Sequence, residues 1–267
     1  MENLHIGIQL FSLRNDLEKD FEGTLRKVKE LGYDCVEFAG LYGRTPSEVK
    51  ALCEEIGLIP ISSHTSIDDY INNPNLISEF KELGCKYIAI AHPGRFREFD
   101  KMLDEYVSYI KKFAKDCADA GIQLCYHNHD MELDFVNGER VFDTILKEVD
   151  LLQPEFDVCW VNVSGLDTPQ YIRKYSGRVE IIHLKDYVGS RNNNMYELIG
   201  VDKEKQAHDA TKFEFRPLGQ GVQNFPPIIE AAKDAGAKWF IFEMDWSADI
   251  PAIECARMSI EYLKEIL

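Results

Sequence analysis

Short apolar runs that resemble β-strands alternate with amphipathic, helix-like stretches along the whole chain of 267 residues. Such alternation is typical of parallel sheets whose strands are joined by helices. The strand-like runs are Leu4–Leu10, Cys35–Phe38, Ile59–Ser63, Tyr87–Ala91, Gln123–His127, Glu155–Val158, Val179–Leu184 and Trp239–Glu243. Eight strand–helix units within about 250 residues are what a closed (β/α)₈ TIM barrel requires, so we predict this α/β fold.

A doubly wound parallel sheet is the main alternative to the barrel. Its dinucleotide-binding form carries the pattern G-x-G-x-x-G directly after the first strand. Here the first strand-like run is followed by Phe11, Ser12, Leu13 and Arg14, which contain no glycine. The sequence therefore favours the barrel and gives no support for dinucleotide binding.

One connection is much longer than the others. Residues 187–223 follow the seventh strand-like run, are polar at their start and close on Arg216-Pro217-Leu218-Gly219-Gln220-Gly221. Long loops inside compact domains are usually lids or binding elements, so we expect this loop at the barrel mouth. A disordered surface insertion is the alternative. No Pro-, Gly- or Ser-rich linker divides the chain, so residues 1–267 are expected to form a single domain.

The composition limits the class of partner and compartment. A formal net charge of −16 argues against a nucleic-acid partner, because phosphate binding needs a clustered basic surface. The seven cysteines include no Cys-x-x-Cys pair, which disfavours disulfides and thiolate zinc sites and suits the reducing cytoplasm. No apolar run approaches the roughly 20 residues that cross a bilayer, and the first residues do not resemble a secretory signal. We expect a soluble cytoplasmic protein without a membrane partner.

Three strand-like runs end in side chains that commonly bind metal ions: Asp157, His183 and Glu243. The carboxyl ends of barrel strands meet at one mouth, so these side chains are expected to converge. An unpaired charge there would cost several kcal/mol, and a divalent ion would remove that cost. Oxygen ligands combined with imidazole suit Mn²⁺, Mg²⁺ or Fe²⁺ at least as well as Zn²⁺.

The fifth strand-like run offers two further ligands. His127 and His129 are two residues apart, so both can face the same side of a strand. His127 lies deeper and is placed to complete the metal site. Glu132, just past the strand, is the alternative ligand, because a carboxylate binds a hard cation better than imidazole does. We leave the choice open; the residue left free would serve as an acid or base, with His129 near a substrate hydroxyl.

Other polar and aromatic residues are expected around the substrate. Lys185 shares a strand face with His183, so its ammonium group can reach a substrate oxygen beside the metal. Trp160 offers an apolar platform for a sugar face, although a packing role explains it equally well. The expected substrate-binding residues are Gln9, Glu37, His64, His92, Trp160, Asp186 and Arg216.

A metal ion flanked by acids and bases favours removal of a proton next to a carbonyl. The cation polarises the adjacent carbonyl and hydroxyl oxygens, and a carboxylate or imidazole takes the proton to give a metal-stabilised enediolate. Return of the proton gives isomerisation or epimerisation, whereas loss of a β-substituent gives elimination. The residues alone leave both outcomes open. The candidate catalytic residues are Glu132, Glu243, His129 and Lys185.

Several motifs resemble the xylose-isomerase-like TIM barrel superfamily, often labelled sugar phosphate isomerase/epimerase or AP endonuclease family 2-like. The resemblance covers essentially the whole chain. It rests on Gly7–Arg14, Tyr126–Glu132, Phe156–Trp160, His183-x-Lys185-Asp186, Leu218–Gly221 and Glu243-x-Asp245. In the epimerase and hydroxypyruvate isomerase branches, Glu, Asp, His and Glu surround Mn²⁺ or a similar ion, and the two Glu residues exchange protons with the substrate.

Carried onto this chain, the resemblance implies Asp157, His183 and Glu243 as ligands. The fifth strand departs from the pattern, because His127-Asn128-His129 stands where those branches have Glu-Asn-His. A His-x-His start is similar to inosose dehydratase and to enzymes that act on 3-keto sugars. Endonuclease IV shares the barrel, but its trinuclear zinc site needs more ligands and its DNA partner suits a less acidic surface.

We therefore predict a divalent-metal-dependent sugar isomerase or epimerase. Mn²⁺ is the first choice of ion, with Mg²⁺, Fe²⁺, Co²⁺ or Zn²⁺ as alternatives. The second prediction is a keto-sugar or keto-inositol dehydratase or lyase, including 3-keto-glycoside elimination, and the third is a non-catalytic carbohydrate-binding barrel. The expected partner is a small sugar or keto-sugar, and a homo-oligomer is also compatible with the sequence.

Overall fold

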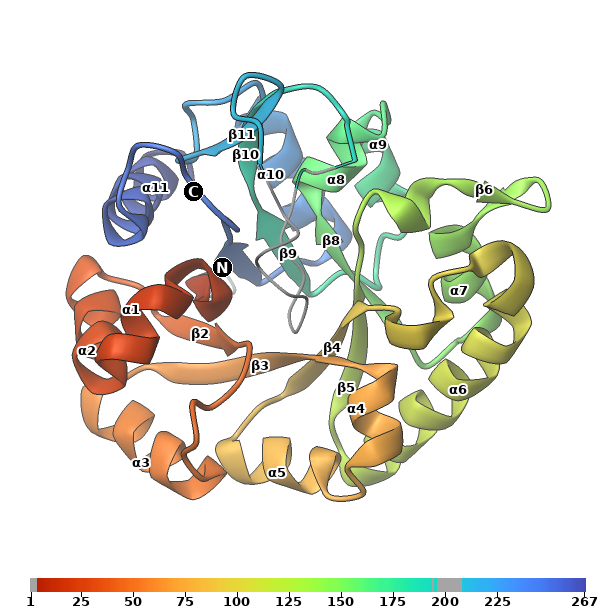
Figure 1. Ribbon diagram of the computed structural model, residues 1–267, viewed down its shortest axis with the longest axis horizontal. Helices are drawn as coiled ribbons and strands as arrows, with labels where there is room; N and C mark the ends of the chain where they lie inside the picture. The colour runs from red at the N-terminus through yellow and green to blue at the C-terminus, as the bar shows by residue number, and fades with distance from the viewer. Residues whose placement is uncertain (1–3, 194, 196–207) are drawn as a thin grey trace.

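The computed structural model describes residues 4–193, 195 and 208–267, and its centre is a closed barrel of parallel strands (Figure 1). Around the barrel, β1 (His5–Gln9) lies between β12 (Trp239–Phe242) and β2 (Cys35–Phe38). The remaining strands are β3 (Ile59–Ser66), β4 (Tyr87–His92), β5 (Gln123–His127), β8 (Gln153–Asp157) and β9 (Ile181–Leu184), which pairs with β12 and closes the ring. The predicted TIM barrel is confirmed.

Helices form an outer ring around the strands (Figure 1). They are α1 (Arg14–Lys19), α2 (Phe21–Leu31), α3 (Pro46–Ile56), α4 (Ile67–Asn72), α5 (Leu76–Leu83), α6 (Phe99–Ala120), α7 (Val141–Glu148), α8 (Val158–Val163), α9 (Thr168–Arg173), α10 (Phe225–Ala235) and α11 (Ala252–Ile266). Their apolar stripes face the strands; in α2, for example, Phe21, Leu25 and Val28 are buried. Gly32 ends α2 with φ of 101°, a left-handed conformation that glycine adopts at low cost.

Residues 187–223, expected as a loop, contain regular structure at both ends. Strand β10 (Asp186–Gly189) pairs antiparallel with β11 (Phe213–Arg216). The two strands form a two-stranded hairpin that follows β9. The middle of the expected loop, residues 194 and 196–207, lies outside the described residues. A second small hairpin, β6 (Phe135–Val136) with β7 (Glu139–Arg140), follows β5.

The barrel interior changes from apolar to polar along the strands. The apolar layer includes Cys35, Cys125, Ile181 and Ile241. Two residues further along each strand, or just past its end, lie Glu37, His127, His183 and Glu243, all buried. Because side chains alternate with a period of two, the residues of both layers point into the barrel. A polar layer therefore lies directly on an apolar floor.

Gly7 leaves room for this floor, because a Cβ atom at its position would lie 2.5 Å from both Cys35 Sγ and Ile241 Cδ1. All seven cysteines are free and buried. Among the residues that the structure describes, no helix is both long enough and apolar enough to cross a membrane.

Candidate active site and metal centre

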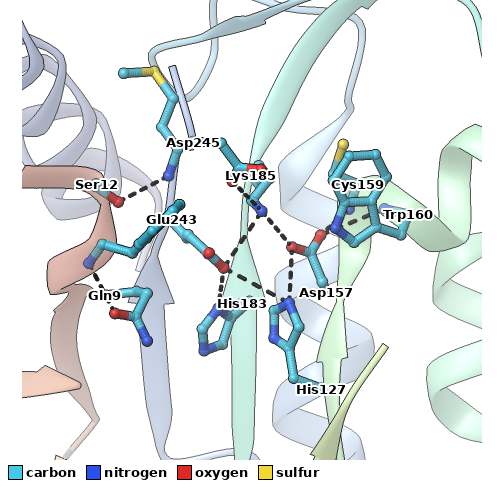
Figure 2. A network of polar contacts seen from close by, with 12 residues as sticks. Gln9, Ser12, His127, Asp157, Cys159, Trp160, His183, Lys185, Glu243 and Asp245 are labelled. Carbon is cyan, nitrogen blue, oxygen red and sulfur yellow. Dashed lines mark hydrogen bonds and ion pairs between the residues drawn. The ribbon is translucent and has the colours of Figure 1, made fainter. Parts of the chain in front are cut away.

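Four side chains from four strand ends converge at the mouth of the barrel. They are His127 of β5, Asp157 of β8, His183 of β9 and Glu243, which directly follows β12. All are buried, and one donor atom from each lies within 4.8 Å of the others. Figure 2 shows their side chains pointing toward one another. The structure thus brings together the three predicted ligands and the fifth-strand histidine.

Two pairs of donor atoms in this group are spaced as metal ligands require, whereas His183 Nδ1 and Glu243 Oε2 are 2.7 Å apart and share a hydrogen bond. His127 Nε2 lies 3.8 Å from both Asp157 Oδ2 and Glu243 Oε2. Two ligands that are each about 2.1 Å from a tetrahedral ion lie about 3.4 Å apart, so these separations fit a shared ion. Asp157 Oδ2 has Lys185 Nζ at 3.2 Å as an ion-pair partner, but both ring nitrogens of His127 are buried without a hydrogen-bond partner among the described residues. Such atoms are costly unless something binds them, and a divalent cation would.

Asp157 is held in place by backbone groups. Its Oδ1 accepts hydrogen bonds from the N–H groups of Cys159 (2.8 Å) and Trp160 (3.4 Å), so the carboxylate caps α8. The side chain of Asn128 contacts both the N–H and the carbonyl of Asp157 and ties the end of β5 to that of β8. Burial raises the pKa of the Asp157 carboxyl to about 6, against the opposing effect of Lys185. The second oxygen, Oδ2, stays directed into the group.

Lys185 places its ammonium group among three carboxylates (Figure 2). Its Nζ lies 3.2 Å from Asp157 Oδ2, 3.4 Å from Glu243 Oε2 and 2.9 Å from Asp245 Oδ1, and the side chain has no exposed surface. Burial disfavours the charged form, but the carboxylates outweigh burial and hold the pKa of Lys185 well above its usual range. Asp245, which our set of site residues omits, thus belongs to the site as the closest partner of Lys185.

We call His127, Asp157, His183 and Glu243 the ligand group. A layer of polar residues lies beneath it. Glu37, His64 and Glu155 are buried inside the barrel, and His64 Nε2 lies 3.0 Å from a carboxylate oxygen of each of the two glutamates. Glu37 and His64 were expected at the substrate, whereas Glu155 was not predicted as a site residue. The period of two in β8, which places Glu155 on the same face as Asp157, is the signal that could have found it.

Glu132 lies outside the ligand group. Its Oε2 accepts a hydrogen bond from the N–H of His129 (2.8 Å) and its Oε1 one from the Tyr126 hydroxyl (3.2 Å). Burial raises the pKa of Glu132 to about 7. Of the two alternative fifth-strand ligands, the structure places His127 in the group and turns Glu132 toward the backbone.

His129 lies beside the group on the outer side of His127. Its ring centre is 5.1 Å from that of His127 and 5.7 Å from that of Trp160. Burial, supported by the nearby charge of Lys185, holds the pKa of His129 well below its usual range, so its imidazole is neutral. A neutral imidazole at this position can accept a proton.

Two of the expected substrate-binding residues have structural partners instead. Asp186 accepts hydrogen bonds from four backbone N–H groups, those of Tyr187, Gly219, Gly221 and Gln223, at 2.8 to 3.2 Å. It therefore organises the turn after β11 rather than facing a substrate. The Arg216 guanidinium forms an ion pair with Glu214 in the same strand, 2.5 Å between Nη2 and Oε2.

The remaining expected substrate residues lie at different depths. Gln9, Glu37 and Trp160 have no exposed surface. Trp160 stacks with Phe213 and meets Phe215 edge-on, so the hairpin covers it and it packs as a core residue. His92 is half-buried at the end of β4, where its Nδ1 accepts a hydrogen bond from the Gly94 N–H (3.1 Å). His92 therefore keeps exposed surface, whereas His64 belongs to the buried layer beneath the ligand group.

The fold and this group of side chains define a TIM-barrel protein whose strand ends form a candidate divalent-metal centre. The family model for xylose isomerase-like TIM barrels matches residues 25–266. The chain therefore belongs to the xylose isomerase-like TIM barrel family, as its motifs predict.

Individual relatives are distant but cover most of the chain. An inosose dehydratase of Geobacillus kaustophilus is 21% identical over 275 residues, which cover 91% of this chain and 86% of the relative. A sugar phosphate isomerase/epimerase structure from Parabacteroides distasonis is 23% identical, with a TM-score of 0.76 over 98% of each chain. An IolI protein structure with a bound zinc atom is 13% identical, with a TM-score of 0.70 over 98% of each chain. At these identities the solved structures show a shared fold.

Proposed function

We propose that this protein is a divalent-metal-dependent carbon–oxygen lyase that acts on a small keto-sugar or keto-inositol. It would remove a proton next to the carbonyl and expel the hydroxyl group on the following carbon. The observation that carries the proposal is the position of His127 in the ligand group together with the turning away of Glu132. The group then holds Glu243 as its single glutamate, whereas isomerases and epimerases of this family shuttle protons between two.

His127, Asp157, His183 and Glu243 would hold the ion. When bound, a divalent cation supplies Lewis acidity, which polarises carbonyl and hydroxyl oxygens and acidifies the neighbouring C–H group. The nitrogen and oxygen donors suit Mn²⁺ as well as Mg²⁺, Fe²⁺, Co²⁺ and Zn²⁺, and Mn²⁺ is our first choice. The IolI structure, which holds zinc in the same fold, supports a divalent ion.

His129 and Lys185 supply the base and the acid of an elimination. The neutral imidazole of His129 lies at the outer edge of the ligand group and would take the proton from carbon. Lys185 Nζ lies within 3.4 Å of two ligand carboxylates, so a substrate oxygen bound at this centre would come next to its ammonium group. Lys185 would give a proton to the departing hydroxyl group, which leaves as water, and Asp245 would hold Lys185 in position.

The inosose dehydratase relatives support elimination, since inosose is a keto-inositol and loss of water is the reaction in their name. The sequence His127-Asn128-His129 at the end of β5 supports elimination too, because it is similar to the His-x-His sequence of inosose dehydratase. A net charge of −16 disfavours nucleic acid as a partner. A sugar isomerase or epimerase is the second candidate function, favoured by the Parabacteroides distasonis neighbour. It shares the first step, because both reactions begin with removal of the same kind of proton. A barrel that only binds carbohydrate would have no need of the buried acid and base beside the ligand group.

The test is incubation of the manganese-loaded protein in D₂O with a panel of ketoses and keto-inositols. For a lyase, we expect new ultraviolet absorbance from an unsaturated carbonyl product and loss of one water by mass spectrometry. An isomerase would give a deuterated isomer with no loss of water. Absence of both deuterium exchange and product across the panel would contradict the proposal. Asp157→Asn, which removes a proposed ligand, is the matched inactive control.

A further inference from the structure

The polar layer beneath the ligand group contacts two of the proposed ligands on their far sides. His183 Nδ1 faces Glu243 at 2.7 Å, whereas its Nε2 lies 2.7 Å from Glu37 Oε2 and 3.2 Å from Glu155 Oε1. His127 shows the same division: Nε2 faces Asp157 and Glu243, and Nδ1 lies 3.4 Å from Glu155 Oε1. Each ring thus has one nitrogen toward the ligand group and one toward a buried glutamate.

The nitrogen–oxygen distances differ between the polar layer of Glu37, His64 and Glu155 (the lower layer) and the ligand group above it (the upper group). In the lower layer, four nitrogen–oxygen separations are 2.7 to 3.2 Å, which is the spacing of N–H···O contacts. Two ligands of one tetrahedral ion lie about 3.4 Å apart, so these pairs are too close to share an ion comfortably. The His127 separations in the upper group are 3.8 Å, and only the His183–Glu243 contact is shorter. The lower separations therefore leave less room for an ion than the His127 separations do. In this structure, His183 makes its hydrogen bond through Nδ1 to Glu243, and His183 Nε2 and His127 Nδ1 face the glutamates without a hydrogen-bond partner among the described residues.

We infer that Glu37 and Glu155 are positioning residues that fix which nitrogen of His183 and His127 is free to bind the ion. The inference rests on the proposed function in one respect, namely that a divalent ion binds the upper group. A neutral imidazole carries a single N–H group. When an ion occupies the upper group, the nitrogen that faces a buried glutamate would give its N–H to that carboxylate, which leaves the opposite nitrogen with a bare lone pair and holds the ring at the required angle.

His64 and Gln9 hold the two glutamates in this role. His64 Nε2 lies 3.0 Å from Glu37 Oε2 and 3.0 Å from Glu155 Oε1, so a single ring bridges the two carboxylates. Gln9 donates a hydrogen bond to Glu37 Oε2 at 2.9 Å, and its own Oε1 accepts one from the Phe11 N–H. Because all these atoms belong to barrel strands or their immediate ends, the positions of the ligand rings are set by the barrel itself.

The experiment measures ion binding without substrate. Metal-free wild type, Glu155→Gln and Glu37→Gln are titrated with Mn²⁺ by calorimetry and with Co²⁺ by visible absorption. Glutamine keeps the shape of glutamate and weakens the acceptor, so we expect Mn²⁺ affinity to fall about 10- to 100-fold in each variant. We also expect an altered Co²⁺ spectrum, because the ring angle changes. Glu180→Gln, a barrel carboxylate that contacts the Tyr87 hydroxyl instead of a ligand ring, should bind both ions like the wild type.

Each result has a definite reading. Affinities within about twofold of wild type, with an unchanged Co²⁺ spectrum in both folded variants, would overturn the inference. Two ions bound per wild-type chain and one per Glu155→Gln chain would also overturn it, because the lower layer would then be a second ion site. If the wild type binds one ion and the variants bind it weakly, but no keto-sugar is turned over, the proposed reaction fails and the inference stands. If the wild type binds no ion, both fail.

Discussion

Lys185 Nζ lies 2.9 Å from Asp245 Oδ1 in the buried interior of the barrel mouth. The same ammonium group lies beside Asp157 and Glu243, two of the proposed ligands, so it carries positive charge where the ion would add more. Two unit charges about 4 Å apart interact by about 4 kcal/mol at the effective dielectric constant of a protein. The Lys185 ammonium group and a bound ion would therefore repel each other. A role of Lys185 in the reaction explains why the site holds it despite this repulsion.

This competition predicts opposite effects of Lys185→Met on binding and turnover. Mn²⁺ affinity should rise at least about tenfold, because the repulsion is removed. The kcat should fall by about 100-fold or more, the usual contribution of a general acid. Calorimetry and steady-state kinetics measure the two quantities. Lys112→Met, on the exposed face of α6, is the control. Weaker Mn²⁺ binding by Lys185→Met would show that the ammonium group supports the ion site.

The alternative fifth-strand ligands can be separated by metal content. His127→Ala should lose most bound Mn²⁺ after gel filtration, because it removes a nitrogen from the ligand group. Glu132→Gln should keep it, because that carboxylate binds the His129 N–H and the Tyr126 hydroxyl. Elemental analysis of both proteins is sufficient. Retention of the metal by His127→Ala with loss by Glu132→Gln would reverse the assignment.

Glu132 also predicts a pH-dependent stability. Burial raises its pKa to about 7 in the folded protein, above the ordinary value of 4.5 for a glutamate. The folded state therefore holds a proton that the unfolded state has released, and the stability contributed by this group is lost as pH rises from about 4.5 to 7. Glu132→Gln removes that loss. The unfolding free energy of Glu132→Gln minus that of wild type should therefore be larger at pH 8 than at pH 5, by up to about 3 kcal/mol.

Denaturant unfolding of the metal-free proteins at the two pH values tests this prediction. Glu82→Gln, at an exposed position of α5, is the matched substitution and should show no such difference. A gap between Glu132→Gln and wild type that is the same at pH 5 and pH 8 would mean that Glu132 does not keep its proton in the folded state.

Asp186 is predicted to act on stability rather than on substrate binding. Asp186→Ala would leave four backbone N–H groups without their acceptor, including those of Gly219 and Gly221. At about 1 to 3 kcal/mol for each unsatisfied donor, we expect a loss of at least about 3 kcal/mol and a Tm lower by about 10 °C. Calorimetry measures the Tm. Asp209→Ala, on the exposed end of the hairpin, is the control. A wild-type Tm with a strongly raised KM would return Asp186 to the substrate site.

The sequence predicts the barrel well because its strands are short apolar runs that glycine-capped helices separate. Cys35–Phe38 and Gln123–His127, for instance, have the predicted limits. The hairpin of β10 and β11 was not predicted. Only Lys185 separates β9 from β10, so β10 looks like a continuation of that strand, and its partner comes from distant sequence.

The ligand group was largely predictable for a similar physical reason. Side chains at the carboxyl ends of parallel strands must meet, so Asp157, His183 and Glu243 could be placed together. What these side chains touch could not be read from the sequence. The contacts of Asp186 with Gly219 and Gly221, and of Glu155 with His64, join segments that only the closed barrel brings together.

The most direct test of the metal centre is anomalous diffraction from a crystal grown with Mn²⁺. Our account predicts one strong peak within about 2.0 to 2.4 Å of donor atoms of His127, Asp157, His183 and Glu243. It would be contradicted by no peak at the barrel mouth, or by a peak among His64, Glu155 and His183 with Asp157 and Glu243 left uncoordinated.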